Sequence, residues 1–198
     1  MNKTIKYAGV AGIFSLIFAV PVIFFEILKS LNKLDGGLVS VYIFVLLISL
    51  ILYIVFIHGF KLVAEKYQNN LLKVSSYILI ISAIVYYGYL VITLISPNLD
   101  NIVIQILAVV ILGAASIPFG IALLKLKPQF GSLATGAGVV EIITGTSLLS
   151  VILSIVGILL LIPLYILTSM ILFRAAKKNR NKSNNLNSIK GICRQRKT

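Results

Sequence analysis

The chain has 198 residues, of which 59% are hydrophobic and 12% are charged. Soluble domains carry roughly 45 to 50% apolar and 25% charged residues, so this composition excludes an ordinary soluble globule. The mean hydropathy of +1.06 also excludes disorder over most of the length. A formal charge of +13 would point to nucleic acid in a soluble protein. In a membrane protein the same charge sets orientation, so we do not expect nucleic acid as a partner.

Long apolar runs between charged residues or turn signals predict six membrane-spanning helices. Each needs about 20 apolar residues, because the hydrocarbon core is about 30 Å thick. The last run, 131–173, contains one charged residue, Glu141, and would be about 65 Å long as a single helix. We divide it at the small polar stretch 144–147, with Ser150 just beyond, because hydroxyl groups there can bond the backbone locally. The predicted helices are 7–28, 38–60, 74–96, 102–124, 131–148 and 151–173.

The distribution of Lys and Arg predicts the orientation. Six crossings place every Lys and Arg on one side of the membrane except Lys29 and Lys33. Because loops rich in Lys and Arg stay in the cytoplasm, we expect both termini there and the protein in a plasma membrane. The predicted fold class is all-α, a polytopic integral membrane protein built as a six-helix bundle with both termini inside.

Two regions follow from this assignment: a six-helix domain over 1–173 and a basic cytoplasmic tail over 174–198. The tail has no acidic residue and is rich in Lys, Arg, Asn and Ser. We therefore expect it to be disordered and to contact anionic lipid head groups. Cys193 is the single cysteine, which excludes a disulfide within one chain.

Small residues recur along one face of three predicted helices. In lipid such residues mark faces where helix backbones approach closely. We expect the first, fourth and fifth helices to form the packed centre; alternatively, one stripe binds a membrane-protein partner or a second copy of the chain. The stripes are Ala8, Gly12, Ser15 and Ala19; Gly113, Ser116 and Gly120; and Ala134, Gly138, Glu141 and Gly145.

Glu141 is the acidic residue expected near the bilayer midplane, about ten residues into the fifth predicted helix. A bare carboxylate is costly at that depth, so the side chain should face protein or water and tend to take up a proton. Tyr86 and Ser116 are expected near the same depth and complete a candidate substrate or proton site. An alternative of equal weight is a protonated Glu141 that only holds two helices together.

The sequence contains no catalytic motif and no metal-ligand spacing, so we expect no enzymatic activity, no catalytic residues, no metal and no cofactor. In size and helix number the chain is similar to small substrate-binding subunits of vitamin transporters, whose first helix also carries small residues for docking. The prediction is a small transporter, or the membrane subunit of one, that uses Glu141. The alternative is a non-catalytic scaffold or assembly protein that holds a partner through its small-residue faces.

Overall fold

The computed structural model describes residues 2–31, 33–150 and 153–195, and over these residues every regular element is helical. Six of the described helices are long and apolar enough to cross a membrane, which confirms the predicted number. A short helix and a 3-10 turn lie in the connections. The elements are α1 (Asn2–Ser30), α2 (Gly36–Lys66), α3 (Asn70–Ile95), η1 (Pro97–Leu99), α4 (Ile102–Leu124), α5 (Lys127–Phe130), α6 (Ser132–Leu149) and α7 (Ser154–Gln195).

Capping side chains fix where the helices begin. Asp35, Asn69 and Asn101 each accept a hydrogen bond from a backbone N–H in the first turn that follows, which satisfies donors that have no partner within the helix. Between α2 and α3, Gln68 adopts a left-handed conformation with φ of 53° and reverses the chain in a tight turn. The Asn69 amide also donates to the carbonyl of Ala122 at 2.9 Å, which joins this turn to the end of α4.

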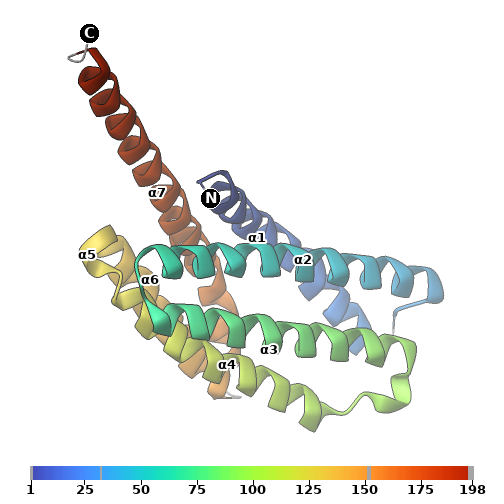
Figure 1. Ribbon diagram of the computed structural model, residues 1–198. Coiled ribbons are helices and arrows are strands. Elements are labelled where there is room, and N and C mark those ends of the chain that lie inside the picture. Colours follow the sequence, from blue (N-terminus) through green and yellow to red (C-terminus); the bar gives the residue numbers. More distant parts are fainter. Residues whose placement is uncertain (1, 32, 151–152, 196–198) are drawn as a thin grey trace.

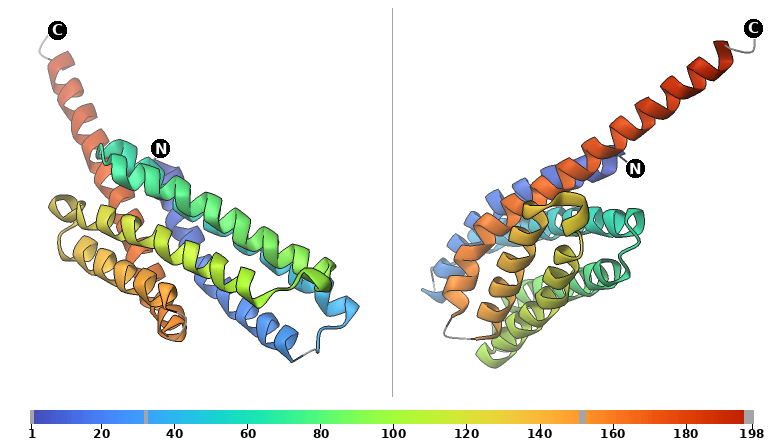
Figure 2. Two further views of the ribbon diagram at one scale, coloured as in Figure 1. Left: turned by 90° about the horizontal axis from the view of Figure 1, so that it is seen from below. Right: turned by 90° about the vertical axis from the view of Figure 1, so that its left-hand side faces the viewer.

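The six long helices form a ring that follows the chain order (Figure 1). Each packs against the next, from α1 to α4, then α4 against α6 and α6 against α7, and α7 returns to α1. Figure 2 shows α1 and α7 side by side, with the last part of α7 projecting past the bundle. Both termini therefore lie at the same end of the bundle, which we call the terminal end.

The two ends of the ring are packed differently. At the terminal end, buried apolar residues from all six long helices form one core, which includes Ile5, Phe60, Leu72, Phe119, Ala134 and Ile171. At the opposite end, a smaller core joins α1, α2 and α3 alone and consists of Phe25, Tyr42, Leu46, Leu90 and Leu94. Among the described residues, α4, α6 and α7 contribute no buried side chain to this smaller core.

The outer surface of the bundle is apolar. Large hydrophobic side chains remain exposed on each long helix, among them Phe14, Phe44, Ile81, Leu107 and Leu159. Soluble monomers rarely expose continuous apolar surface of this extent. A bundle embedded in a bilayer contacts lipid through these side chains.

The sequence-based expectations differ from the structure in three places. The predicted break at 144–147 is helical, because Thr144 and Thr146 donate to carbonyls one turn back, and α6 ends only at Leu149. Residues 174–195, expected to be disordered, continue α7 as helix; extending an existing helix avoids the cost of nucleation. Residues 196–198 of that tail lie outside the described part. Finally, the first, fourth and fifth predicted helices were expected to form the packed centre. In the structure α1 lies mainly against α2 and α7, and only α4 and α6, the fourth and fifth of the long helices, pack together.

Candidate functional site

Glycines bring α4 and α6 into close contact and thereby determine the surroundings of Glu141. An added Cβ at Gly113 would lie 2.8 Å from the carbonyl oxygen of Gly145, and one at Gly120 would lie 2.9 Å from that of Gly138. In the reverse direction, an added Cβ at Gly138 would lie 2.8 Å from the carbonyl oxygen of Gly120, and one at Gly145 would lie 2.8 Å from that of Gly113. We call this contact the glycine seam. Predicted stripes on two helices thus face each other across it.

Glu141 lies on this seam and is buried, with 5% of its surface exposed. Its carboxyl group forms a hydrogen bond with the hydroxyl of Ser116 on α4. The structure therefore brings together two of the three residues proposed for the site, Glu141 and Ser116.

The cavity beside Glu141 has a volume of about 60 Å³. We call it the Glu141 cavity; Ser116, Tyr53 and Tyr165 contribute polar groups to its wall. Binding sites for small molecules measure roughly 300 to 1,000 Å³. The Glu141 cavity has room for a few water molecules and is too small for an organic substrate.

Tyr86, the third predicted residue, does not line the Glu141 cavity. It lines two larger adjoining cavities, of about 430 and 410 Å³, near the opposite end of the bundle. Both contain Glu26, Tyr86, Ile158 and Leu161 in their walls, and together we call them the Glu26 cavity. Tyr86 was expected to be the partner of Glu141 because both residues lie at a similar depth in the membrane. The Tyr86 side chain lies instead on a face of α3 that lines the same cavity as Glu26.

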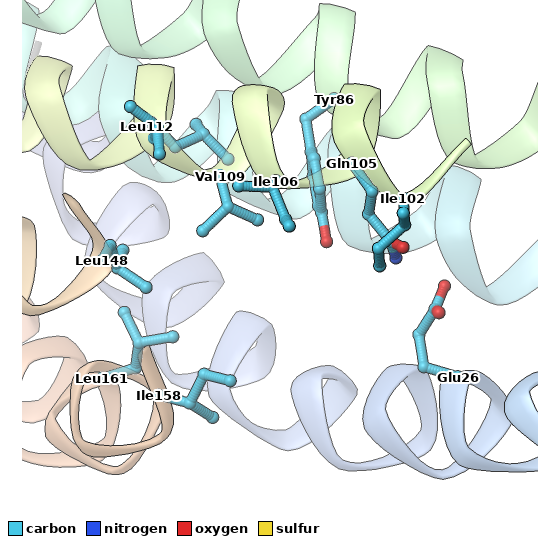
Figure 3. A pocket seen from close by; sticks show the side chains of 11 residues that line it. Glu26, Tyr86, Ile102, Gln105, Ile106, Val109, Leu112, Leu148, Ile158 and Leu161 are labelled. Carbon is cyan, nitrogen blue, oxygen red and sulfur yellow. The ribbon is translucent and has the colours of Figure 1, made fainter. Parts of the chain in front are cut away.

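The Glu26 cavity is polar at one end and apolar at the other. Figure 3 shows the carboxyl of Glu26, the amide of Gln105 and the hydroxyl of Tyr86 near one end. The side chains at the other end are Leu112, Leu148, Ile158 and Leu161, from α4, α6 and α7. These walls come from α1, α3, α4, α6 and α7.

Glu26 is half-buried and is held by a hydrogen bond from the hydroxyl of Tyr42, whose ring stacks on Phe25 at 5.0 Å between centroids. Lys29, one turn further along α1, is bound elsewhere. Its ammonium group lies 2.9 Å from the Asp100 carboxylate and donates to the Thr93 hydroxyl at 3.1 Å. Within the described part of the chain, Glu26 forms no ion pair with a basic residue.

From the sequence, Glu26 is expected among the external interfacial residues, with a place in an outer vestibule as the alternative, and the candidate site did not include it. A signal for its inward direction was present: positions 8, 12, 15, 19, 22 and 26 repeat at alternating intervals of four and three residues. Glu26 thus continues the stripe of Ala8, Gly12, Ser15 and Ala19 along one helix face. The structure places Ser15 and Ala19 in the wall of the Glu26 cavity.

The two cavities share part of their walls. Tyr53, Leu161 and Tyr165 line both the Glu141 cavity and the adjoining part of the Glu26 cavity. Leu161 also lines the rest of the Glu26 cavity. The two cavities are therefore neighbours, separated by side chains that include the two tyrosines Tyr53 and Tyr165.

Comparison with protein-family models gives no match to this chain, and neither the curated proteins nor the solved structures compared with it give one.

Proposed function

We propose that this multi-pass helical protein is a small transporter, or the membrane subunit of a transport complex, whose substrate occupies the Glu26 cavity. The observation that carries this proposal is a cavity of substrate size that contains an acidic side chain with no basic partner among the described residues. Ionisable side chains within membrane spans mark substrate or ion pathways. We further propose that the protein is not an enzyme.

The packing of the bundle supports a transport role. One end of the ring is closed by a core that joins all six long helices, and the other end has a cavity. A transporter alternates which end is open, and in this bundle the Glu26 cavity and the Glu141 cavity adjoin each other across Tyr53, Leu161 and Tyr165. Glu141 then serves as a second, proton-binding carboxyl deeper in the bundle.

The small-residue faces give less support to a scaffold. Such a protein would need these faces free for a partner, yet they are occupied within the chain. Ala8 and Ala134 are buried, an added Cβ at Gly12 would meet Phe56 and Ser169, and Gly113 and Gly120 face α6.

For orientation we propose both termini in the cytoplasm and the protein in a plasma membrane. Among the described residues, Lys and Arg belong to segments toward the terminal end of the bundle, apart from Lys29 and Lys33. The Glu26 cavity then opens toward the outside. A reporter enzyme fused after Thr198 should be active in the cytoplasm, and activity on the outer face would contradict this orientation.

Accessibility of Leu161 tests the transport proposal, because this residue lines both cavities. In a Cys193→Ser background, Leu161→Cys should react with a membrane-impermeant maleimide in right-side-out vesicles and also in inside-out vesicles. Asn98→Cys, exposed in the connection before α4, should react from the outside alone. Reaction of Leu161→Cys from one side under every imposed gradient would contradict alternating access.

A further inference from the structure

We propose that the Glu26 cavity binds a monovalent amphipathic organic cation, with the positive group beside Glu26 and the apolar body between α4, α6 and α7. This inference rests on the proposed function and names the class of substrate for the same cavity. Its basis is the arrangement of one acid beside Tyr86 and Gln105 at one end of a cavity whose other end is apolar.

The charge of the ligand follows from the environment of Glu26. Glu26 is half-buried, and a carboxylate that is partly removed from water is stabilised when it is paired and hydrogen-bonded. Tyr42 supplies one hydrogen bond, and the nearest basic residue on α1, Lys29, is held by Asp100 and Thr93. No Lys, Arg or His lines the described walls of the Glu26 cavity. A ligand cation would complete this site, whereas an anionic ligand would meet the charge of Glu26 with no compensating group.

The polar end also suits an organic cation in particular. Tyr86 and Tyr87 line the cavity and pack edge to face with ring centroids 5.7 Å apart. Aromatic rings attract cations that lie over their faces. A metal ion needs several oxygen, nitrogen or sulfur ligands, and the described residues contain no group of three acidic, His or Cys side chains. The carboxylate and rings therefore fit a substituted ammonium or phosphonium group.

The apolar end determines the rest of the ligand. Leu112, Leu148, Ile158 and Leu161 offer no hydrogen-bonding side chain, and transferring apolar surface from water into such a space is favourable. The volumes of about 430 and 410 Å³ lie within the roughly 300 to 1,000 Å³ of sites for drug-sized ligands. A neutral lipid chain could fill this end, but it would leave Glu26 without a counter-charge.

The probe for this inference is tetraphenylphosphonium, and the matched neutral compound is triphenylphosphine oxide. The full chain, reconstituted in nanodiscs of phosphatidylcholine, should bind tetraphenylphosphonium saturably, and an excess of the neutral compound should not displace it. Glu26→Gln should weaken binding by at least about tenfold, because truncating one partner of a buried charge pair has an effect of that size or more. Glu65→Gln, the same change at an exposed residue at the terminal end, should leave affinity unchanged.

A second variant keeps the test valid if Glu26→Gln is unstable. Ile158→Trp adds volume at the apolar end and retains Glu26, so it should also weaken binding of the probe. Equal affinity of the wild type and Glu26→Gln, or displacement by triphenylphosphine oxide, would overturn the cation site and indicate a neutral or lipid occupant. Two-sided labelling of Leu161→Cys would stand in either case, so failure of the ligand class is distinguishable from failure of the transport proposal.

Discussion

Replacing Gly138 by alanine adds a methyl group directly in the contact between α4 and α6. The new carbon would lie 2.8 Å from the carbonyl oxygen of Gly120 and 2.7 Å from the side chain of Leu124. The leucine can move to another rotamer, but the carbonyl belongs to the backbone of α4. The two helices must therefore separate, or the substituted helix must shift along its axis.

The size of the effect follows from this distance. Carbon and carbonyl oxygen atoms normally approach to about 3.3 to 3.6 Å, so the helices must move apart by roughly half an ångström. Overpacking of this kind costs about 1–3 kcal/mol. Alanine also gains about 0.5–1 kcal/mol over glycine within a helix, which offsets part of the loss.

Gly136→Ala is the matched control, two residues away on the same helix. Its added methyl would meet nothing closer than Leu167, at 4.0 Å, so it retains the gain in helix propensity without the clash. The unfolding free energies of the two variants should differ by about 1–3 kcal/mol, with Gly138→Ala the less stable. Titration with SDS in mixed micelles, followed by circular dichroism, measures both values. If Gly138→Ala were as stable as Gly136→Ala, the close approach of α4 and α6 would be refuted.

Substitutions at three further positions test other contacts. Asn69→Ala should lower the unfolding free energy by about 1–2 kcal/mol, because it removes the helix cap and the hydrogen bond to the Ala122 carbonyl. Asn69→Asp keeps the cap, so its unfolding free energy in the same SDS titration should fall by less. Asp100→Asn should cost under about 1 kcal/mol, because the ion pair with Lys29 is partly exposed; a larger loss, or one that persists in high salt, would contradict this. Glu141→Gln should change stability by less than about 1 kcal/mol, because an amide can still bond to the Ser116 hydroxyl. In vesicles that contain Glu141→Gln, uptake of the tetraphenylphosphonium probe should no longer respond to a pH gradient. If transport were intact and its pH profile unchanged, proton binding by Glu141 would be refuted.

The sequence allowed the spanning helices to be predicted because hydropathy and charge limit where a chain can cross a bilayer. The predicted break at 144–147 was wrong because threonine hydroxyls can be satisfied within a helix as well as in a turn. In the fourth and fifth predicted helices, the spacing of glycines identified faces that the structure brings together at Gly120 and Gly138.

The partner of Glu141 was harder to predict. Counting residues from a loop gives depth in the membrane, but it does not give the direction of a side chain around its helix. Tyr86 and Glu141 are expected at similar depth, yet they line different cavities. Glu26 was assigned to the outer interface, with a vestibule as the alternative, because it lies near the end of its helix; the candidate site did not use the helix face on which it lies.

The closure of the ring by α7 has a consequence for biosynthesis. The first helix is complete at Ser30, and its neighbour α7 begins at Ser154. Translation proceeds at about 5–20 residues per second, so α1 waits on the order of ten seconds after synthesis before α7 is available. During that interval the part of the Glu26 cavity wall that α7 forms is missing. A chain released from the ribosome before α7 would lack Ile158, Leu161 and Tyr165, so α7, made after the other five long helices described, completes the cavity.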